Sequence, residues 1–184
     1  MSGYCDVAPG HPLHGPYHDT EYGFPLVDDD ALLERFALEI NQAGLSWELM
    51  LRKREAFRRA FCGFAVAKVA RFGARDEARL LADAGIVRNR LKVRAVIENA
   101  RRIRALQDSH GSFAAWLDAH HPLTKAEWAK LFKTQFVFTG GEIVGELLMS
   151  TGYLPGAHRE TCPVYNRIAR AKPPWLRAHR FRFA

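Results

Sequence analysis

Residues 28–57 read DDDALLERFALEINQAGLSWELMLRKREAF, and this stretch decides the fold class. Its first half carries apolar residues at the spacing of one buried helical stripe, namely Leu32, Leu33, Phe36, Ala37 and Ile40. The carboxylates from Asp28 to Asp30 supply an N-cap, and Gly44 ends the helix. Because Ser46 can cap a second helix directly afterwards, the stretch predicts two consecutive helices joined by a tight turn.

The same periodicity continues on both sides of this pair. The second helix places Trp47, Met50, Leu51 and Phe57 inward, and further helices are predicted over residues 66–72, 75–84, about 89–108, 113–119, 125–133 and 142–151. In the long helix the predicted core side comprises Leu91, Val93, Val96, Ile97, Ala100 and Ile103. No stretch alternates apolar and polar residues for long enough to predict a strand, so the predicted class is all-α.

Length and composition limit the possible classes of protein. With 184 residues, 48% of them hydrophobic, the chain can bury one good core or two small lobes. Three scattered cysteines are too few for the disulfide framework of a secreted protein, and the residues after Met1 do not have the pattern of a leader. Cys62, beside Phe61 in a helical pattern, is expected to be a buried thiol. No apolar run approaches the roughly 18 residues of a membrane span. We therefore expect a cytoplasmic protein that does not enter membranes.

Positive charge is concentrated in one segment. The net charge of +7 and the pI near 9.6 favour an acidic partner, with the phosphate backbone of nucleic acid as the first candidate. Residues 88–104 hold a single acid, Glu98, against seven bases: Arg88, Arg90, Lys92, Arg94, Arg101, Arg102 and Arg104. The alternative is a solvated helix face, but such a face usually intersperses acids with bases. The imbalance favours a basic stripe that contacts DNA.

The two ends of the chain depart from the helical pattern. Residues 1–27 are rich in Gly, Pro, His and Tyr, which predicts irregular backbone that needs fastening. Four possible zinc ligands lie at the two ends, namely Cys5, His18, His158 and Cys162. Two thiolates and two imidazoles suit a tetrahedral zinc ion, and four protein ligands make such a site structural. The alternative is that these spacings are accidental.

Two further segments concern partners and domain boundaries. Residues 131–141 and the helix after them have the form of a helix-hairpin-helix, in which Thr139, Gly140 and Gly141 present backbone N–H groups to a phosphate. Gly-Gly before a helix is common, so this signal is weak alone. We expect one domain over residues 1–165 and a basic aromatic tail over 166–184. The tail is either a flexible arm or packs back through Trp175 and Phe181.

Several of these segments together resemble a known family, the type I 3-methyladenine DNA glycosylases of the helix-hairpin-helix superfamily. The resemblance runs from Cys5 to about Cys162 and rests on YHDTEYG (17–23), LEINQAGLSW (38–47), KRE (53–55), DAGIVRNRLK (83–92) and His158-x3-Cys162. It implies a helix-hairpin-helix glycosylase bundle in which a structural zinc on Cys5, His18, His158 and Cys162 joins the terminal segments.

The resemblance also implies roles for individual residues. Glu39 would hydrogen-bond the excised base and serve as the catalytic residue, with Tyr17 and Trp47 stacked around the base and Tyr22 in the pocket wall. Gly44-Leu45 would enter the duplex where the base has left. With the basic stripe and the hairpin, the expected DNA-binding set is Gly44, Leu45, Arg88, Arg90, Lys92, Thr139, Gly140 and Gly141.

The chemistry expected of this set is modest. A base in duplex DNA must be extruded and then held by stacking and edge hydrogen bonds. N3-methyladenine is cationic while attached to the sugar, so its glycosidic bond is already weak, and aromatic faces attract it. The hairpin lacks the lysine of strand-cleaving glycosylases, which predicts a monofunctional enzyme that leaves an abasic site.

Three questions stay open at the sequence level. Val7 and Tyr22 stand where typical members carry tryptophan, so the pocket wall and the lesion range, including 3-methylguanine, are undecided. A non-catalytic zinc-clasped DNA-binding module explains the charge and the metal but leaves Glu39 unused. A small-molecule hydrolase would make the basic excess incidental. We expect a monomer, because no exposed apolar seam is evident.

Overall fold

The described part of the chain, residues 3–177 of a computed structural model, folds into helices and connecting loops without strands. This confirms the all-α prediction. In chain order the elements are α1 (Tyr4–Val7), α2 (His14–Thr20), α3 (Asp29–Gln42), α4 (Trp47–Ala60), the 3-10 turn η1 (Cys62–Phe64), α5 (Val66–Val69), α6 (Ala74–Ala82), α7 (Arg90–His110), α8 (Phe113–His120), α9 (Lys125–Gln135), α10 (Gly141–Ser150) and α11 (Tyr165–Arg170).

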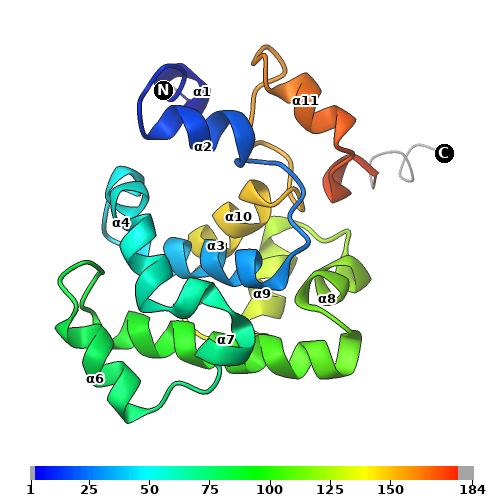
Figure 1. The fold of residues 1–184 in the computed structure, drawn as a ribbon. Coiled ribbons are helices and arrows are strands. Elements are labelled where there is room, and N and C mark those ends of the chain that lie inside the picture. Colours follow the sequence, from blue (N-terminus) through cyan, green and yellow to red (C-terminus); the bar gives the residue numbers. More distant parts are fainter. Residues whose placement is uncertain (1–2, 178–184) are drawn as a thin grey trace.

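Helix α3 lies at the centre of the molecule and contacts α4, α7, α8 and α10 (Figure 1). Its start is held by three consecutive carboxylates with separate partners, of which Asp30 accepts from the Val66 amide at 2.8 Å. Asp28 accepts a hydrogen bond from the Ala31 amide and caps α3 itself, as predicted. Asp29 accepts from the amides of Phe113 and Ala114, which ties the first turn of α8 to the first turn of α3.

The turn between α3 and α4 forms where the sequence predicts it. Gly44 has a φ of +77°, which glycine adopts without a Cβ penalty. The Ser46 side chain accepts a hydrogen bond from the Leu49 amide and caps α4. Lys92 of α7 holds the other side of this turn, because its Nζ donates to the carbonyls of Asn41 and Ala43 at 2.8 and 2.6 Å. These carbonyls would otherwise end α3 without a partner.

Because Lys92 is anchored in this way, the side chains that face the core in the first turn of α7 differ from those predicted. Leu91 was expected on the core side, but it is 69% exposed, whereas the neighbouring Lys92 is 6% exposed. Burial of an ammonium group is tolerated here because two carbonyl oxygens replace its water. The rest of the predicted stripe is correct, since Val93, Val96 and Ile103 are buried.

The N-terminal segment is more regular than predicted. Instead of irregular backbone throughout, it contains the short helices α1 and α2. Pro16 lies in the first turn of α2, where a missing N–H costs nothing. No conventional capping residue precedes this helix, but the His11 ring accepts from the amides of Leu13 and His14. Such a side-chain cap is invisible to a rule based on Ser, Thr, Asp and Asn.

The C-terminal segment packs against the domain as far as residue 177. Ile168 of α11 is 3% exposed and belongs to a small apolar cluster with Cys162 and Val164, separate from the main core. The rings of Tyr165 and Trp175 lie 6.4 Å apart. Phe181, the other residue through which the tail might pack, lies outside the described residues.

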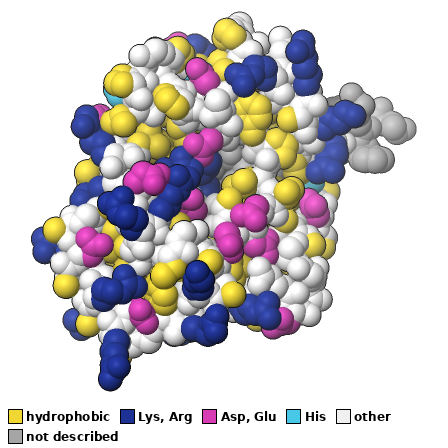
Figure 2. Space-filling model, viewed as in Figure 1, with side chains coloured by type: hydrophobic (Ala, Val, Ile, Leu, Met, Phe, Trp, Pro, Cys, Tyr) yellow, Lys and Arg dark blue, Asp and Glu magenta, His cyan; other side chains and the backbone are white. Residues whose placement is uncertain are grey.

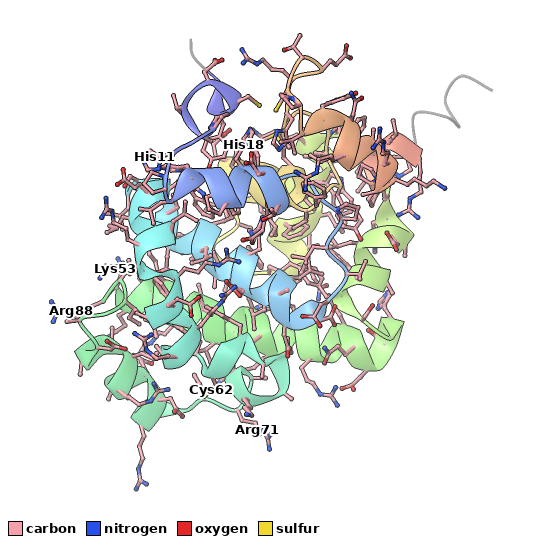
Figure 3. The ribbon with its side chains drawn as sticks, turned by 45° about the horizontal axis from the view of Figure 1, so that its top comes forward. His11, His18, Lys53, Cys62, Arg71 and Arg88 are labelled. Carbon is pink, nitrogen blue, oxygen red and sulfur yellow. The ribbon has the colours of Figure 1, made fainter. Side chains whose placement is uncertain are left out.

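The predicted burial of Cys62 is wrong. Cys62 was expected to be a buried thiol, but it is exposed at the start of η1, far from His18 (Figure 3). The helical pattern breaks there because α4 ends at Ala60 and Cys62 adopts a φ of +54°. Its side chain therefore turns away from the neighbouring Phe61, which is buried.

Within the described residues, α7 is the longest helix, and no helix is both long and apolar enough to cross a bilayer.

The contact between Lys92 and the end of α3 predicts a loss of stability on substitution. Lys92→Met keeps the apolar stem but leaves the carbonyls of Asn41 and Ala43 without their donor, which we expect to lower the free energy of unfolding by about 1–3 kcal/mol. Chemical denaturation measures this difference. Arg88→Met, at an exposed position, is the control and should change stability by less than about 0.5 kcal/mol. Equal effects would contradict the anchoring role.

Candidate functional site

A cavity of about 300 Å³ opens where α1, α2, α3, α4 and α10 meet. It is lined by Tyr4, Tyr17, Tyr22, Glu39, Gln42, Trp47 and Glu146. The four residues predicted to surround a base therefore lie around one cavity: Tyr17, Tyr22, Glu39 and Trp47. The indole Nε1 of Trp47 is buried and makes no hydrogen bond within the described residues. The cavity offers aromatic walls, two carboxyl groups and an unused donor.

Glu39 is the more deeply buried of the two carboxyl groups that line the cavity. It is 4% exposed on α3, one residue from the apolar stripe. Burial raises the pKa of Glu39 to about 8, with Arg35 lowering it and Glu146 raising it further. The carboxyl is therefore poised to change its protonation state near neutral pH when a charged ligand enters.

Tyr17 is held against the cavity by Arg35. The Arg35 Nη1 donates to the Tyr17 hydroxyl at 2.8 Å, and its guanidinium carbon lies 4.7 Å from the centre of the same ring. The other nitrogen, Nη2, donates to Glu21 at 3.0 Å. This cation is not water-exposed, since Arg35 is 4% exposed.

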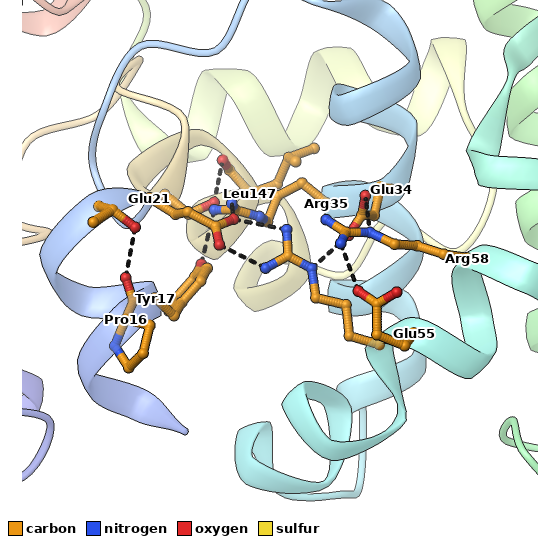
Figure 4. Close-up of polar contacts among 11 residues, drawn as sticks. Pro16, Tyr17, Glu21, Glu34, Arg35, Glu55, Arg58 and Leu147 are labelled. Carbon is orange, nitrogen blue, oxygen red and sulfur yellow. Dashed lines mark hydrogen bonds and ion pairs between the residues drawn. The ribbon is translucent and has the colours of Figure 1, made fainter. Parts of the chain in front are cut away.

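Arg35 belongs to a chain of ion pairs that joins α2, α3 and α4 (Figure 4). Glu21 also accepts two hydrogen bonds from Arg54, which together with Arg35 lower its pKa although burial opposes ionisation. Glu34 accepts from Arg54 and Arg58 in turn. Alternating charges leave no member of this network unpaired, so it fixes the orientation of Tyr17 relative to α3 and α4.

Three lining residues were not identified from the sequence. Gln42 is three residues after Glu39 on the same helix face, and that spacing was the available signal. Tyr4 lies next to the proposed ligand Cys5. Glu146 reaches the cavity only because α10 packs on α3, and its sequence neighbours carry no signal. Val7, expected to change the pocket wall, is 55% exposed and is not among the lining residues.

The four predicted metal ligands come together although they lie at opposite ends of the chain. Cys5 Sγ lies 3.6 Å from His158 Nδ1, His158 Nδ1 lies 3.4 Å from Cys162 Sγ, and Cys162 Sγ lies 3.7 Å from His18 Nε2. Metal–ligand bonds of about 2.0–2.3 Å in a tetrahedron place neighbouring ligand atoms about 3.6 Å apart. The donor set and its spacing therefore fit a zinc ion.

The remaining ring nitrogens of both histidines have partners that orient them. His18 Nδ1 contacts the Asp19 carboxylate at 2.7 Å. His158 Nε2 lies 2.9 Å from the backbone carbonyl of Tyr22. Such outer contacts fix the ring orientation and leave the other nitrogen for a metal.

The metal-ligand cluster and the cavity share the same short segments. Tyr4 directly precedes Cys5, Tyr17 directly precedes His18, and the Tyr22 carbonyl faces His158. Any displacement of the cluster therefore moves the three tyrosines that line the cavity.

The predicted DNA-binding residues fall into groups with different surroundings. Leu45 is 41% exposed at the turn after Gly44, and Arg88 is exposed without a partner among the described residues. Lys53 donates to the carbonyls of Ala84 and Gly85 and so holds the loop that leads to Arg88 (Figure 3). Lys92 is the exception, because its ammonium group is buried at the end of α3 and cannot reach a phosphate.

Most of the basic stripe is engaged with neighbouring groups of the protein. Arg94 pairs with Glu77 at 2.9 Å, and Arg90 lies 3.6 Å from the same carboxylate. Arg101 donates to the carbonyls of Ala70 and Phe72. Acidic and basic side chains also alternate over the face shown in Figure 2. The one-sided charge in the sequence is therefore partly neutralised by α6 and by loops.

The predicted hairpin is a five-residue connection between α9 and α10, which pack on each other. Gly140 is the N-cap of α10, and Thr139 is 8% exposed. Glu142, which directly follows the two glycines, forms an ion pair with Lys125 at 2.9 Å. Its charge is thereby turned towards α9.

Sequence comparisons match this chain to one family and to relatives of the same kind. Residues 7–135 match the family described as methyladenine glycosylase. DNA-3-methyladenine glycosylase 1 of Escherichia coli (strain K12) is 40% identical over 119 residues, which are 64% of each chain. The DNA-3-methyladenine glycosylase of Haemophilus influenzae is 32% identical over 182 residues, covering 89% of this chain and 98% of the relative.

Solved structures agree with these sequences. The 3-methyladenine DNA glycosylase I of Staphylococcus aureus superposes with a TM-score of 0.78 at 31% identity, covering 88% of this chain and 95% of the other. A variant of a 3-methyladenine DNA glycosylase I in complex with 3-methyladenine gives a TM-score of 0.79 at 31% identity over 89% of this chain and 97% of the other. The chain belongs to the methyladenine glycosylase family, which confirms the resemblance.

The buried state of Glu39 predicts a pH-dependent gain in stability for Glu39→Gln. Because the folded-state pKa of about 8 exceeds that of the unfolded chain, the native state holds the extra proton between about pH 4.5 and 8. Stability of the wild type therefore falls as pH rises through this window. We expect the variant to match the wild type near pH 5 and to be more stable by on the order of a few kcal/mol near pH 9.

Thermal and denaturant unfolding at several pH values measure this difference. Glu142→Gln is the matched control, because the Glu142 side chain is 86% exposed. A stability difference for Glu39→Gln that does not change with pH would show that the Glu39 carboxyl is ionised throughout.

Proposed function

We propose that this chain is a monofunctional DNA glycosylase that flips 3-methyladenine out of alkylated double-stranded DNA and removes it by hydrolysis, leaving an abasic site and acting as a monomer. The observation that carries the proposal is the buried Glu39 carboxyl within an aromatic cavity, in a member of the methyladenine glycosylase family.

The cavity suits a cationic purine. The methyl group at N3 leaves a positive charge on the base while it is attached to the sugar, and the faces of Tyr17 and Trp47 attract that charge. Glu39 accepts a hydrogen bond from the exocyclic amine. An entering cation favours the ionised carboxylate and so lowers the pKa of Glu39 from about 8. Binding energy is thus linked to the charge that distinguishes the damaged base.

The DNA-contacting surface that we propose surrounds the mouth of the cavity. Leu45 at the tip of the α3–α4 turn enters the space that the flipped base leaves, and Lys92 stiffens this turn from behind. Arg88 and the more weakly paired Arg90 contact phosphates. The α9–α10 connection acts as a helix-hairpin-helix, in which the first amides of α10 point at a phosphate oxygen.

The absence of an amine nucleophile supports hydrolysis. Residues 136–141 read FVFTGG and include no lysine. A strand-cleaving glycosylase needs an amine to form a covalent Schiff base with the sugar. Water is therefore the nucleophile in the proposed reaction.

Zinc is proposed as a structural component, held by Cys5, His18, His158 and Cys162. Four protein ligands leave no position for water, so the metal supplies cross-linking and no Lewis-acid chemistry. Its contribution is to hold α1 and α2 over the cavity.

Release of free base from methylated duplex DNA tests the proposed activity. We expect the wild type to release 3-methyladenine, and Glu39→Gln to lower kcat/KM by about tenfold to a hundredfold, because a charge-assisted hydrogen bond is lost. Leu45→Ala should reduce release from duplex more than from single strands. Salt-dependent DNA binding without base release would instead indicate a non-catalytic module. A borohydride-trapped adduct would contradict the monofunctional mechanism.

Metal analysis and unfolding test the zinc proposal. We expect about one zinc ion per chain, and a lower Tm after chelation or in Cys162→Ala, because the ion cross-links distant segments. Cys62→Ala is the matched control, since Cys62 is exposed and outside the cluster; its zinc content and Tm should equal those of the wild type. A metal-free protein with unchanged stability would show that the cluster is not a metal site.

A further inference from the structure

Glu146 is a second carboxyl at the cavity, and the proposed excision gives it no role. It lies on α10, which packs on α3, and lines the cavity together with Glu39. The Tyr22 hydroxyl donates to Glu146 Oε2 at 3.2 Å. One carboxylate oxygen is therefore fixed by a neighbouring aromatic residue, while the other has no protein partner within the described residues.

The cation nearest to Glu146 along α9 is already committed elsewhere. Lys125 pairs with Glu142, one turn earlier on α10, at 2.9 Å. The stem of Lys125 crosses Gly145 so closely that a Cβ at that position would lie 2.5 Å from the lysine Cε. Glycine at position 145 thus lets Lys125 pass over α10 towards Glu142, and no salt bridge to Glu146 forms.

The charges around the cavity explain why a second acidic group matters. Arg35 is packed against Tyr17, so one face of that ring already interacts with a cation. The same guanidinium offsets the negative charge of Glu39. A cationic base that entered a cavity with Glu39 alone would therefore meet a carboxylate and a buried arginine of opposite charge. Glu146 adds a second carboxyl to the cavity. Burial raises its pKa, so an entering cation favours its ionised form, whereas a neutral base does not.

We propose that Glu146, oriented by Tyr22, is a second base-recognition residue that selects positively charged alkylated purines over neutral purines. This inference rests on the proposed excision function. Glu39 from α3 and Glu146 from α10 approach the base from two helices, so that the attraction to a charged base is shared between them. Position 146 lies outside the segment 7–135 that matches the family.

Binding of two small probes tests the proposal independently of DNA. The 3,9-dimethyladeninium ion is a permanent cation whose N9-methyl replaces the sugar, and 9-methyladenine is its neutral counterpart. Their dissociation constants can be measured by quenching of tryptophan fluorescence or by calorimetry. We expect Glu146→Gln to weaken binding of the cation about tenfold and to change binding of the neutral base by less than twofold, because glutamine keeps the shape but loses the charge.

Two further variants separate recognition from folding. Glu98→Gln makes the same change of charge on α7, outside the cavity, and should leave both dissociation constants unchanged. Tyr22→Phe keeps the ring but removes the hydrogen bond to Glu146, and should weaken cation binding by a smaller factor than Glu146→Gln. Equal losses for both probes in Glu146→Gln would indicate a structural role and overturn the proposal. If neither the wild type nor Glu146→Gln binds 9-methyladenine detectably, the affinity for the cation is compared alone. A loss of that affinity at unchanged Tm supports the proposal, and an unchanged affinity overturns it.

Excision of 3-methyladenine by the wild type is measured in parallel. Failure of the wild type to release the base would contradict the proposed function itself. Release by the wild type, together with a cation-to-neutral affinity ratio that is unchanged in Glu146→Gln, would overturn only the role of Glu146.

Discussion

The partly buried ion-pair network around Glu21 and Arg35 is the constraint on which the cavity depends. Residues Glu21, Arg35, Arg54, Glu34 and Arg58 alternate in charge and connect the end of α2 with α3 and α4. Arg35 and Glu34 are buried members of this network, and a buried charge is tolerated only when it has a partner, so removal of their partners carries a desolvation cost. The network thereby gives three helices a single relative position, and Tyr17 inherits that position through its hydrogen bond with Arg35.

Two sets of contacts connect the segments around the cavity. On one side, Lys92 fastens the end of α3 and the exposed turn at Leu45. On the other, the four Cys and His residues bring α1 and α2 to the loop that contains His158. Between them lies the Glu39 carboxyl, whose burial raises its pKa to about 8. A rigid frame around a group that resists ionisation favours ligands that supply positive charge, in agreement with membership of the methyladenine glycosylase family.

Much of the fold was predictable because its signals are local. The capping residues Asp28 and Ser46 and the glycine at position 44 act within a few residues, and the structure has them as predicted. One prediction failed because a distant partner decides the outcome, and two failed because the local signal is not a standard one. Leu91 is exposed because the neighbouring Lys92 turns inward to bind the carbonyls at the end of α3. Helix α2 begins where the ring of His11 serves as the cap. Cys62 is exposed because the backbone turns sharply after α4.

The sequence by itself determined the helical class, the helix pair around Gly44, the resemblance to the family and the residue types able to hold a base or a metal. Periodicity, capping and motif spacing are properties of neighbouring residues, so they can be read from one chain. Only the tertiary structure decided which of these residues meet. It brought Glu146 on α10 to the same cavity as Glu39, paired most of the basic stripe with acids and carbonyls, and buried Lys92. Charge balance in a cavity depends on every element that packs around it, and no local pattern contains that information.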